Sequence, residues 1–162
     1  MFDPTICTML QEFSQGQPPD HYWFGPWHAV LCTLFRGYAI APQPRRNASS
    51  DFVIEVCQLL YPPGSDLRLR TVLIVKIKKN QDWEANIPSL EKEIGCLTDA
   101  AFSDKGTAIS SVYWIGAMGT HWYYGVKHKG QDPKPLIDVH DNMHDQASYD
   151  DFQRLTALVA GM

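Results

Sequence analysis

Thr71-Val-Leu-Ile-Val-Lys-Ile-Lys78 is the stretch of this 162-residue chain that decides the fold. It is a nearly continuous run of branched and apolar residues, which is typical of a strand covered on both faces. Its charged residues, Lys76 and Lys78, lie at the end and are separated by one apolar residue. Because side chains alternate between the faces of a strand, both lysines are expected on the same face. We therefore predict that residues 71–78 form the centre of a β-sheet and place two cations at one strand end.

The remaining sequence predicts an α/β domain. Phe52 to Leu60 is rich in branched and aromatic residues, which favour a strand, and Pro62-Pro-Gly-Ser-Asp66 is a turn that leads into residues 71–78. Asp3 is placed to cap a first helix, and Ser148 with Asp151 to begin a last one. The expected elements are helices at 4–14 and 26–36, strands at 38–41, 52–60 and 71–78, a helix at 87–102, strands at 111–117 and 121–127, an extended piece at 135–139 and a helix from 148.

Composition and charge limit the classes of function. The length and a hydrophobic content of 44% fit one globular domain over residues 1–162,. The formal net charge is −4, whereas domains that bind nucleic acid through its phosphates usually carry a basic excess. No apolar run approaches the roughly 18 to 20 residues that cross a bilayer, and the first residues lack the pattern of a secretory signal. We therefore expect an intracellular protein, in the cytoplasm or nucleus, that does not bind a membrane.

Five short motifs follow one another along the chain. They are Gly25-Pro-Trp27, Tyr38-Ala-Ile-Ala-Pro-Gln43, Asp51-Phe-Val-Ile-Glu55, Leu73-Ile-Val-Lys-Ile-Lys78 and Tyr113-Trp-Ile-Gly-Ala-Met-Gly-Thr-His-Trp-Tyr-Tyr124. In their order and spacing, over about residues 20 to 160, the chain resembles a group of basidiomycete fungal proteins with a PD-(D/E)XK, or restriction-endonuclease-like, core. The resemblance implies an αβββαβ core, with a central mixed sheet flanked by helices and with extra N- and C-terminal helices.

The same resemblance implies the positions of a metal site. In such nucleases two carboxylates on neighbouring strands hold Mg²⁺, and a lysine two residues after the second acid stabilises charge or positions water. Asp51 matches the first acid and Lys78 the lysine, while Lys76 stands where the second acid should be. An ammonium group cannot ligate Mg²⁺ and repels it at about 4 Å. Asp51 is therefore expected to be a metal ligand only if a metal binds at all.

An acid from elsewhere could replace the missing ligand. Glu55 shares a face with Asp51 but lies about 13 Å away along the strand, which is too far to share a metal. The predicted helix that follows the strand at 71–78 contains Glu91 and Glu93 and is preceded by Glu84. Glu91 and Glu93 are the geometrically suitable candidates, and the sequence does not choose between them.

Three functional hypotheses follow. The first is a degenerate nuclease-like protein without cleavage activity and without a cofactor, which acts as an interaction module or binds an anion or nucleic acid at a pocket lined by lysines. The second is a Mg²⁺-dependent nuclease with a relocated acid. The third is a structural protein that self-associates as a homodimer. In a purely structural role, Lys76 and Lys78 would form a solvated strand end that pairs with Asp51.

A second group of chemical side chains lies in Asp138-Val-His-Asp-Asn-Met-His144. Histidines four residues apart can hold a metal on a helix, but the segment has no apolar helical face and lacks the Glu of a zinc protease. We expect loop residues here.

Aromatic residues cluster near the second helix and on the strand pair at 111–127. They lack interleaved Arg or Lys, so a core or a protein interface is favoured over base stacking. Trp27 and Trp114 are expected in the core. Trp23 and Trp122 are the candidate interface residues for a protein partner or a second copy, and no ligand or partner is named by the sequence.

Overall fold

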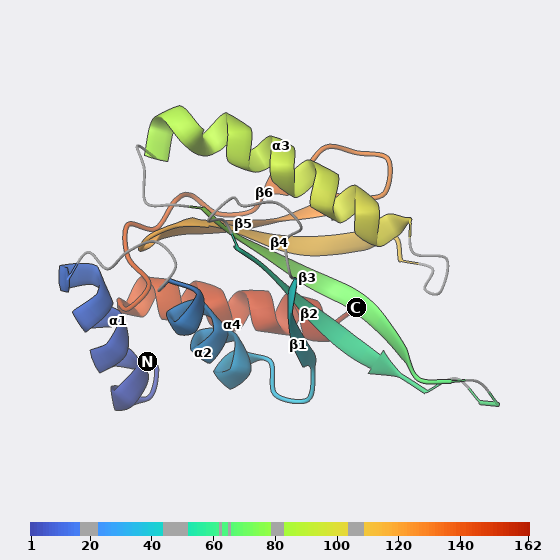
Figure 1. The fold of residues 1–162 in the computed structure, drawn as a ribbon, viewed down its shortest axis with the longest axis horizontal. Helices are drawn as coiled ribbons and strands as arrows, with labels where there is room; N and C mark the ends of the chain where they lie inside the picture. Colours follow the sequence, from blue (N-terminus) through green and yellow to red (C-terminus); the bar gives the residue numbers. More distant parts are fainter. Residues whose placement is uncertain (17–22, 44–51, 62, 65, 79–82, 104–108) are drawn as a thin grey trace.

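The computed structural model describes residues 1–16, 23–43, 52–61, 63–64, 66–78, 83–103 and 109–162. A mixed β-sheet of six strands forms the middle layer, with one helix on one face and three on the other (Figure 1). The elements are α1 Pro4–Gly16, α2 Phe24–Leu34, β1 Ala39–Gln43, β2 Phe52–Leu60, β3 Arg68–Lys78, α3 Trp83–Phe102, β4 Ser111–Met118, β5 His121–His128, β6 Lys134–Pro135 and α4 Gln146–Ala160.

The sheet follows chain order, β1-β2-β3-β4-β5-β6. Among the strands of the described residues, only β3 and β4 pair in parallel, with α3 as the crossover between them, and the other neighbours are antiparallel. Every residue of β3 from Val72 to Ile77 is buried, as expected for a strand covered on both faces. The prediction that residues 71–78 form the centre of an α/β sheet is confirmed.

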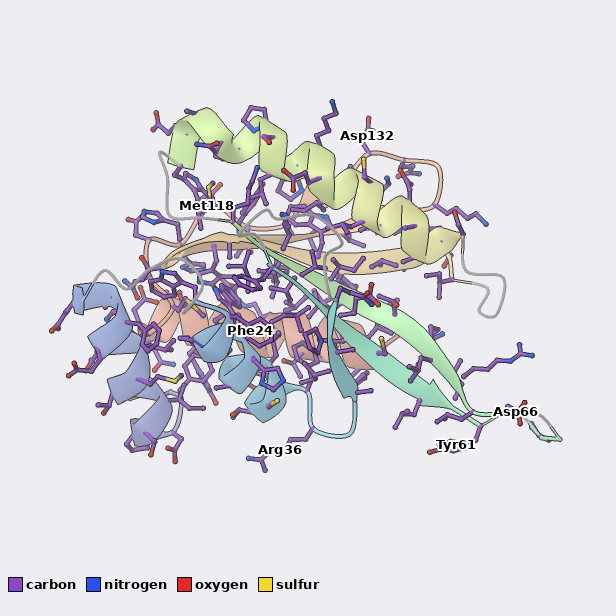
Figure 2. The ribbon with its side chains drawn as sticks, viewed as in Figure 1. Phe24, Arg36, Tyr61, Asp66, Met118 and Asp132 are labelled. Carbon is purple, nitrogen blue, oxygen red and sulfur yellow. The ribbon has the colours of Figure 1, made fainter. Side chains whose placement is uncertain are left out.

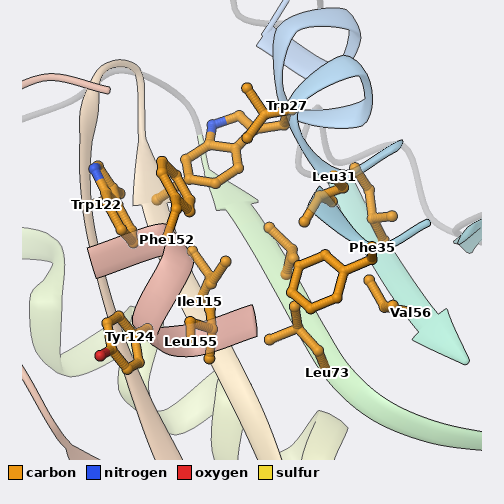
Figure 3. Packing of buried hydrophobic residues seen from close by; sticks show 14 of the residues in the cluster. Trp27, Leu31, Phe35, Val56, Leu73, Ile115, Trp122, Tyr124, Phe152 and Leu155 are labelled. Carbon is orange, nitrogen blue, oxygen red and sulfur yellow. The ribbon is translucent and has the colours of Figure 1, made fainter. Parts of the chain in front are cut away.

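The larger part of the core lies between the sheet and the layer of α1, α2 and α4. Trp122 of β5 stacks on Phe152 of α4, with ring centroids 3.8 Å apart and planes 4° from parallel, and Trp27 of α2 meets both rings edge-on (Figure 3). The indole Nε1 of Trp122 donates to Ser148 Oγ at 3.1 Å. This stack joins α2 and α4 to the sheet.

Two predicted interface residues belong to this core, and those predictions are wrong. Trp23 is 3% exposed and Trp122 is fully buried, so neither indole offers surface to a partner. Trp23 packs edge-on against Phe13 of α1 at 5.8 Å, which pins that helix to α2. The predicted core positions Trp27 and Trp114 are confirmed, since both are fully buried.

On the other face, α3 packs closely against β4. Its buried residues Leu90, Ile94, Thr98 and Phe102 recur every four residues, which is the spacing of one helical face. Gly116 of β4 makes this approach possible: a Cβ there would lie 3.0 Å from Leu90 and 3.1 Å from Ile94 side-chain atoms. A side chain at this position would therefore force the neighbouring side chains of α3 and β5 to shift.

The largest differences from the predicted elements occur at their ends. β3 begins three residues earlier than predicted, at Arg68, and α3 begins at Trp83. The cap of α4 is Asp145, whose carboxylate accepts from the Ser148 backbone N–H at 2.6 Å, so Ser148 is buried in the first turn and is not the cap. Within the described part of the chain, no helix combines the length and hydrophobicity needed to span a bilayer.

Replacing Trp122 with Ala should lower the free energy of unfolding by about 4 kcal/mol, because it removes a fully buried ring and leaves a cavity. Leu158→Ala, at an exposed position of α4, should change it by less than about 0.5 kcal/mol. Urea unfolding followed by circular dichroism measures both, and equal effects would contradict the central place given to the aromatic stack.

Candidate functional site

The two lysines of the predicted motif lie at the end of the central strand, on the face covered by α3. Lys76 pairs in register with Val53 of β2 on one side and with Gly116 of β4 on the other. Because Gly116 is the residue over which α3 packs, Lys76 projects beneath that helix. Its side chain is fully buried, and that of Lys78 is 12% exposed. The expectation that both lysines share a face is met, but Lys76 is not a solvated strand end.

Glu93 of α3 binds both ammonium groups. Its Oε2 lies 2.7 Å from Lys76 Nζ, and its Oε1 lies 2.8 Å from Lys78 Nζ. Lys78 also donates to Ser89 Oγ, one helical turn earlier, at 2.9 Å. We call Lys76, Lys78, Ser89 and Glu93 the lysine–glutamate cluster. An acid from α3 therefore contacts both lysines at the end of β3.

The charge state of Glu93 follows from these contacts. Its partial burial acts to raise the pKa, but hydrogen bonds and attraction from Lys76 and Lys78 outweigh burial and hold the pKa of Glu93 at about 2, below its ordinary 4.5. Glu93 is therefore a carboxylate at neutral pH. A folded-state pKa below the unfolded value means that the carboxylate stabilises the fold above about pH 4.5, and that this contribution is lost as the pH falls toward 2.

The second candidate acid, Glu91, points elsewhere. It lies on the side of α3 facing β5, where Tyr123 Oη is 3.4 Å from its Oε1. Burial, followed by the nearby Glu91 carboxylate, raises the pKa of Tyr123, so the phenol stays neutral. Of the two acids that the sequence left open, Glu93 is the one that joins the lysines.

Asp51, the predicted first acid, lies outside the described residues. Phe52, which follows it in the chain, pairs with Ile77 between the two lysines. In the part of the chain that the structure describes, no group of three or more His, Cys, Asp or Glu side chains is arranged to hold a metal ion.

A further buried lysine was missed at the sequence level. Lys127 of β5 is 4% exposed, and its Nζ lies 2.7 Å from Asp99 Oδ1 and 3.1 Å from the Gly95 carbonyl oxygen, both on α3. Its burial could have been predicted from its position at the end of a strand that is covered on both faces, as is the case for Lys76. The helix α3 is thus tied to β3 and to β5 by ion pairs.

The Asp138–His144 segment does not form a metal site of its own. His140 bonds Asp151 of α4 at 2.8 Å, and its ring stacks on Trp122. Asp141 lies 3.7 Å from His121. The imidazole of His140 therefore helps to attach α4 to the edge of the sheet, and His144 takes no part in that contact.

Chemically, the lysine–glutamate cluster holds two cations and one carboxylate. A divalent ion placed there would meet two ammonium groups and a carboxylate already bound to both, which disfavours metal binding. Beside it, a shallow hollow of about 470 Å³ is lined by Ser89, Lys92, Glu93, Cys96 and Leu97.

Comparison of the chain with protein-family models, with curated proteins and with solved structures gave no match.

Glu93→Gln should destabilise the protein at pH 7 by about 3 kcal/mol, because it removes a carboxylate that is bonded to the buried Lys76 ammonium,. As the pH falls from about 4.5 to 2, the wild type should lose the stability that the Glu93 carboxylate contributes, and the variant should not show this loss. Urea unfolding at several pH values tests both effects.

The matched control is Glu91→Gln, which removes a neighbouring carboxylate that does not contact the lysines. It should cost less than about 1 kcal/mol and retain the acid profile of the wild type. Equal destabilisation by the two variants would show that the geometry of the cluster is not what Glu93 contributes.

Proposed function

We propose that the chain is a degenerate PD-(D/E)XK nuclease-like domain that does not cleave phosphodiesters and acts as an interaction module. The order of elements from α2 to β4 is helix, three strands, helix, strand, in agreement with the αβββαβ order of that core. The mixed sheet, with its parallel β3–β4 pair joined by α3, supports the same assignment.

The observation that carries the loss of activity is the burial of Lys76. At the position of the second metal ligand stands a fully buried ammonium bonded to Glu93 at 2.7 Å. A buried charge paired in this way is costly to expose or to leave alone. Binding of Mg²⁺ beside Lys76 would therefore have to overcome this ion pair.

The same contacts favour a macromolecular partner over a bound anion. Lys76 is inaccessible, and Lys78 is largely covered and already bonded to Glu93 and Ser89. An anion at this pocket would have to compete with Glu93 for both ammonium groups. The net charge of −4 also gives no general attraction for nucleic acid.

The alternative is a Mg²⁺-dependent nuclease that uses Glu93 as its relocated acid. The observation in its favour is that Glu93 reaches the motif position from α3. Activity by this route requires Lys76 to release Glu93 when metal binds, so metal and the ion pair would compete for one carboxylate.

Thermal unfolding with Mg²⁺, Mn²⁺ and Ca²⁺, beside cleavage assays on plasmid and single-stranded DNA, tests the proposal. The wild type should show no metal-dependent change in Tm and no cleavage. Lys76→Glu restores the acid and places it opposite Glu93, so it should unfold at lower temperature without metal. At a Mg²⁺ concentration ten times its dissociation constant, its Tm should rise by about 3 to 6 °C.

Lys76→Met is the matched control, because it removes the ammonium group without adding a ligand, and it should gain no response to metal. Stabilisation of the wild type by Mg²⁺, together with cleavage that Glu93→Gln abolishes, would overturn the proposal in favour of the relocated acid. Absence of a metal response in Lys76→Glu would show that the position is not a former metal site.

A further inference from the structure

The outer end of the β2–β3 hairpin extends beyond the rest of the sheet. Among the described residues, β1 pairs with β2 only from Val53 to Cys57, and β4 pairs with β3 only from Leu73 onward. Gln58–Leu60 and Arg68–Arg70 therefore pair only with each other. Figure 1 shows this ribbon running out past the helices, and Figure 2 shows Tyr61 and Asp66 at its end. We call residues 58–61 and 66–70 the outer hairpin.

One face of the outer hairpin is apolar. Leu59 lies directly opposite Leu69 in the register. Tyr61 follows β2 and Leu67 precedes β3, and the alternation of side chains, continued one residue beyond each strand, places both on the same face as Leu59 and Leu69. The exposed fraction is 37% for Leu59, 46% for Leu69, 75% for Tyr61 and 51% for Leu67. They make up four of the eight large apolar side chains that are exposed in the described chain. Half of the exposed apolar groups are thus concentrated on a single two-stranded ribbon.

The cations of the hairpin lie on its opposite face. Arg68 pairs with Leu60 and Arg70 with Gln58, one residue out of phase with the Leu59–Leu69 pair. Arg70 bonds the side chain of Gln58 and lines a hollow with Tyr113 and with Leu158 of α4. The guanidinium groups therefore do not interrupt the apolar face, so two such faces can approach each other without bringing these charges together.

We propose that the apolar face of the outer hairpin binds the same face of a second copy of this chain. This inference is independent of the nuclease-like assignment. With roughly 200 Å² for a fully exposed large side chain, the four exposed fractions amount to about 400 Å² per copy. A symmetric pair would bury about 800 Å² of apolar surface and, with the polar rim, reach the lower end of specific interfaces, near 1,000 to 1,200 Å².

The size of the surface sets the kind of association. Interfaces at the lower end of that range are typical of weak or transient complexes, so we expect a reversible dimer. Dimerisation would also stabilise the outer hairpin, because a two-stranded hairpin alone is marginally stable and becomes more stable when its apolar face is covered.

Sedimentation velocity on the full chain, from about 5 to 500 µM, tests the proposal. The wild type should shift from monomer to dimer as its concentration rises. Leu69→Glu should weaken the dimer at least tenfold, since two buried carboxylates would face an apolar surface. Leu69 is already nearly half exposed, so the variant should keep the circular dichroism spectrum and Tm of the wild-type monomer.

Leu136→Glu is the matched control, because Leu136 is similarly exposed and follows β6, at the far edge of the sheet. It should leave the dimer unchanged.

Two results would overturn the proposal. One is a wild type that stays monomeric over the whole concentration range. If that monomer binds vesicles of phosphatidylcholine and phosphatidylserine, and Leu69→Glu abolishes this binding, the apolar face is assigned to a lipid surface instead. The other is a dimer that Leu69→Glu leaves intact. Neither depends on metal binding or cleavage, so the test is separate from that of the nuclease-like assignment.

Discussion

The arrangement of the α3 layer depends on one constraint, the burial of the Lys76 ammonium at the centre of the sheet. A charge with no access to water is costly unless an oppositely charged partner lies within hydrogen-bond distance. In the described structure Glu93 meets this requirement at 2.7 Å, from a helix that crosses over the strand. The requirement therefore fixes where along β3 this helix can lie.

A second ion pair fixes the rotation of the same helix. With about 100° per residue, Glu93 and Asp99 flank the buried stripe of Leu90, Ile94 and Thr98 on its two sides. One acid reaches β3 through Lys76, and the other reaches β5 through Lys127, while the stripe lies over Gly116 of the strand between them. Apolar packing sets the depth of α3, and the two ion pairs set its orientation.

Much of this arrangement could be predicted from local patterns. The apolar run before Lys76 predicted the central strand, and strand alternation predicted that Lys76 and Lys78 share a face. The choice between Glu91 and Glu93 could not be made, because two residues apart on a helix point in nearly opposite directions and the rotation of α3 depends on contacts with β3 and β5. The interface predictions for Trp23 and Trp122 failed for a related reason: aromatic content does not reveal how many faces of a strand or helix are covered.

The ion pair between Lys76 and Glu93 also bears on what the cluster contributes. Replacing a buried ion pair with well-packed apolar residues is often neutral or stabilising, whereas removing one partner is strongly destabilising. The cluster therefore adds position more than net stability, because it holds α3 over the strand end. A carboxylate held in this way, with a pKa near 2, remains charged across the physiological range. Metal chemistry at this point would first have to break a contact on which the helix depends, so interactions of the chain are better sought on surfaces that its packing leaves exposed.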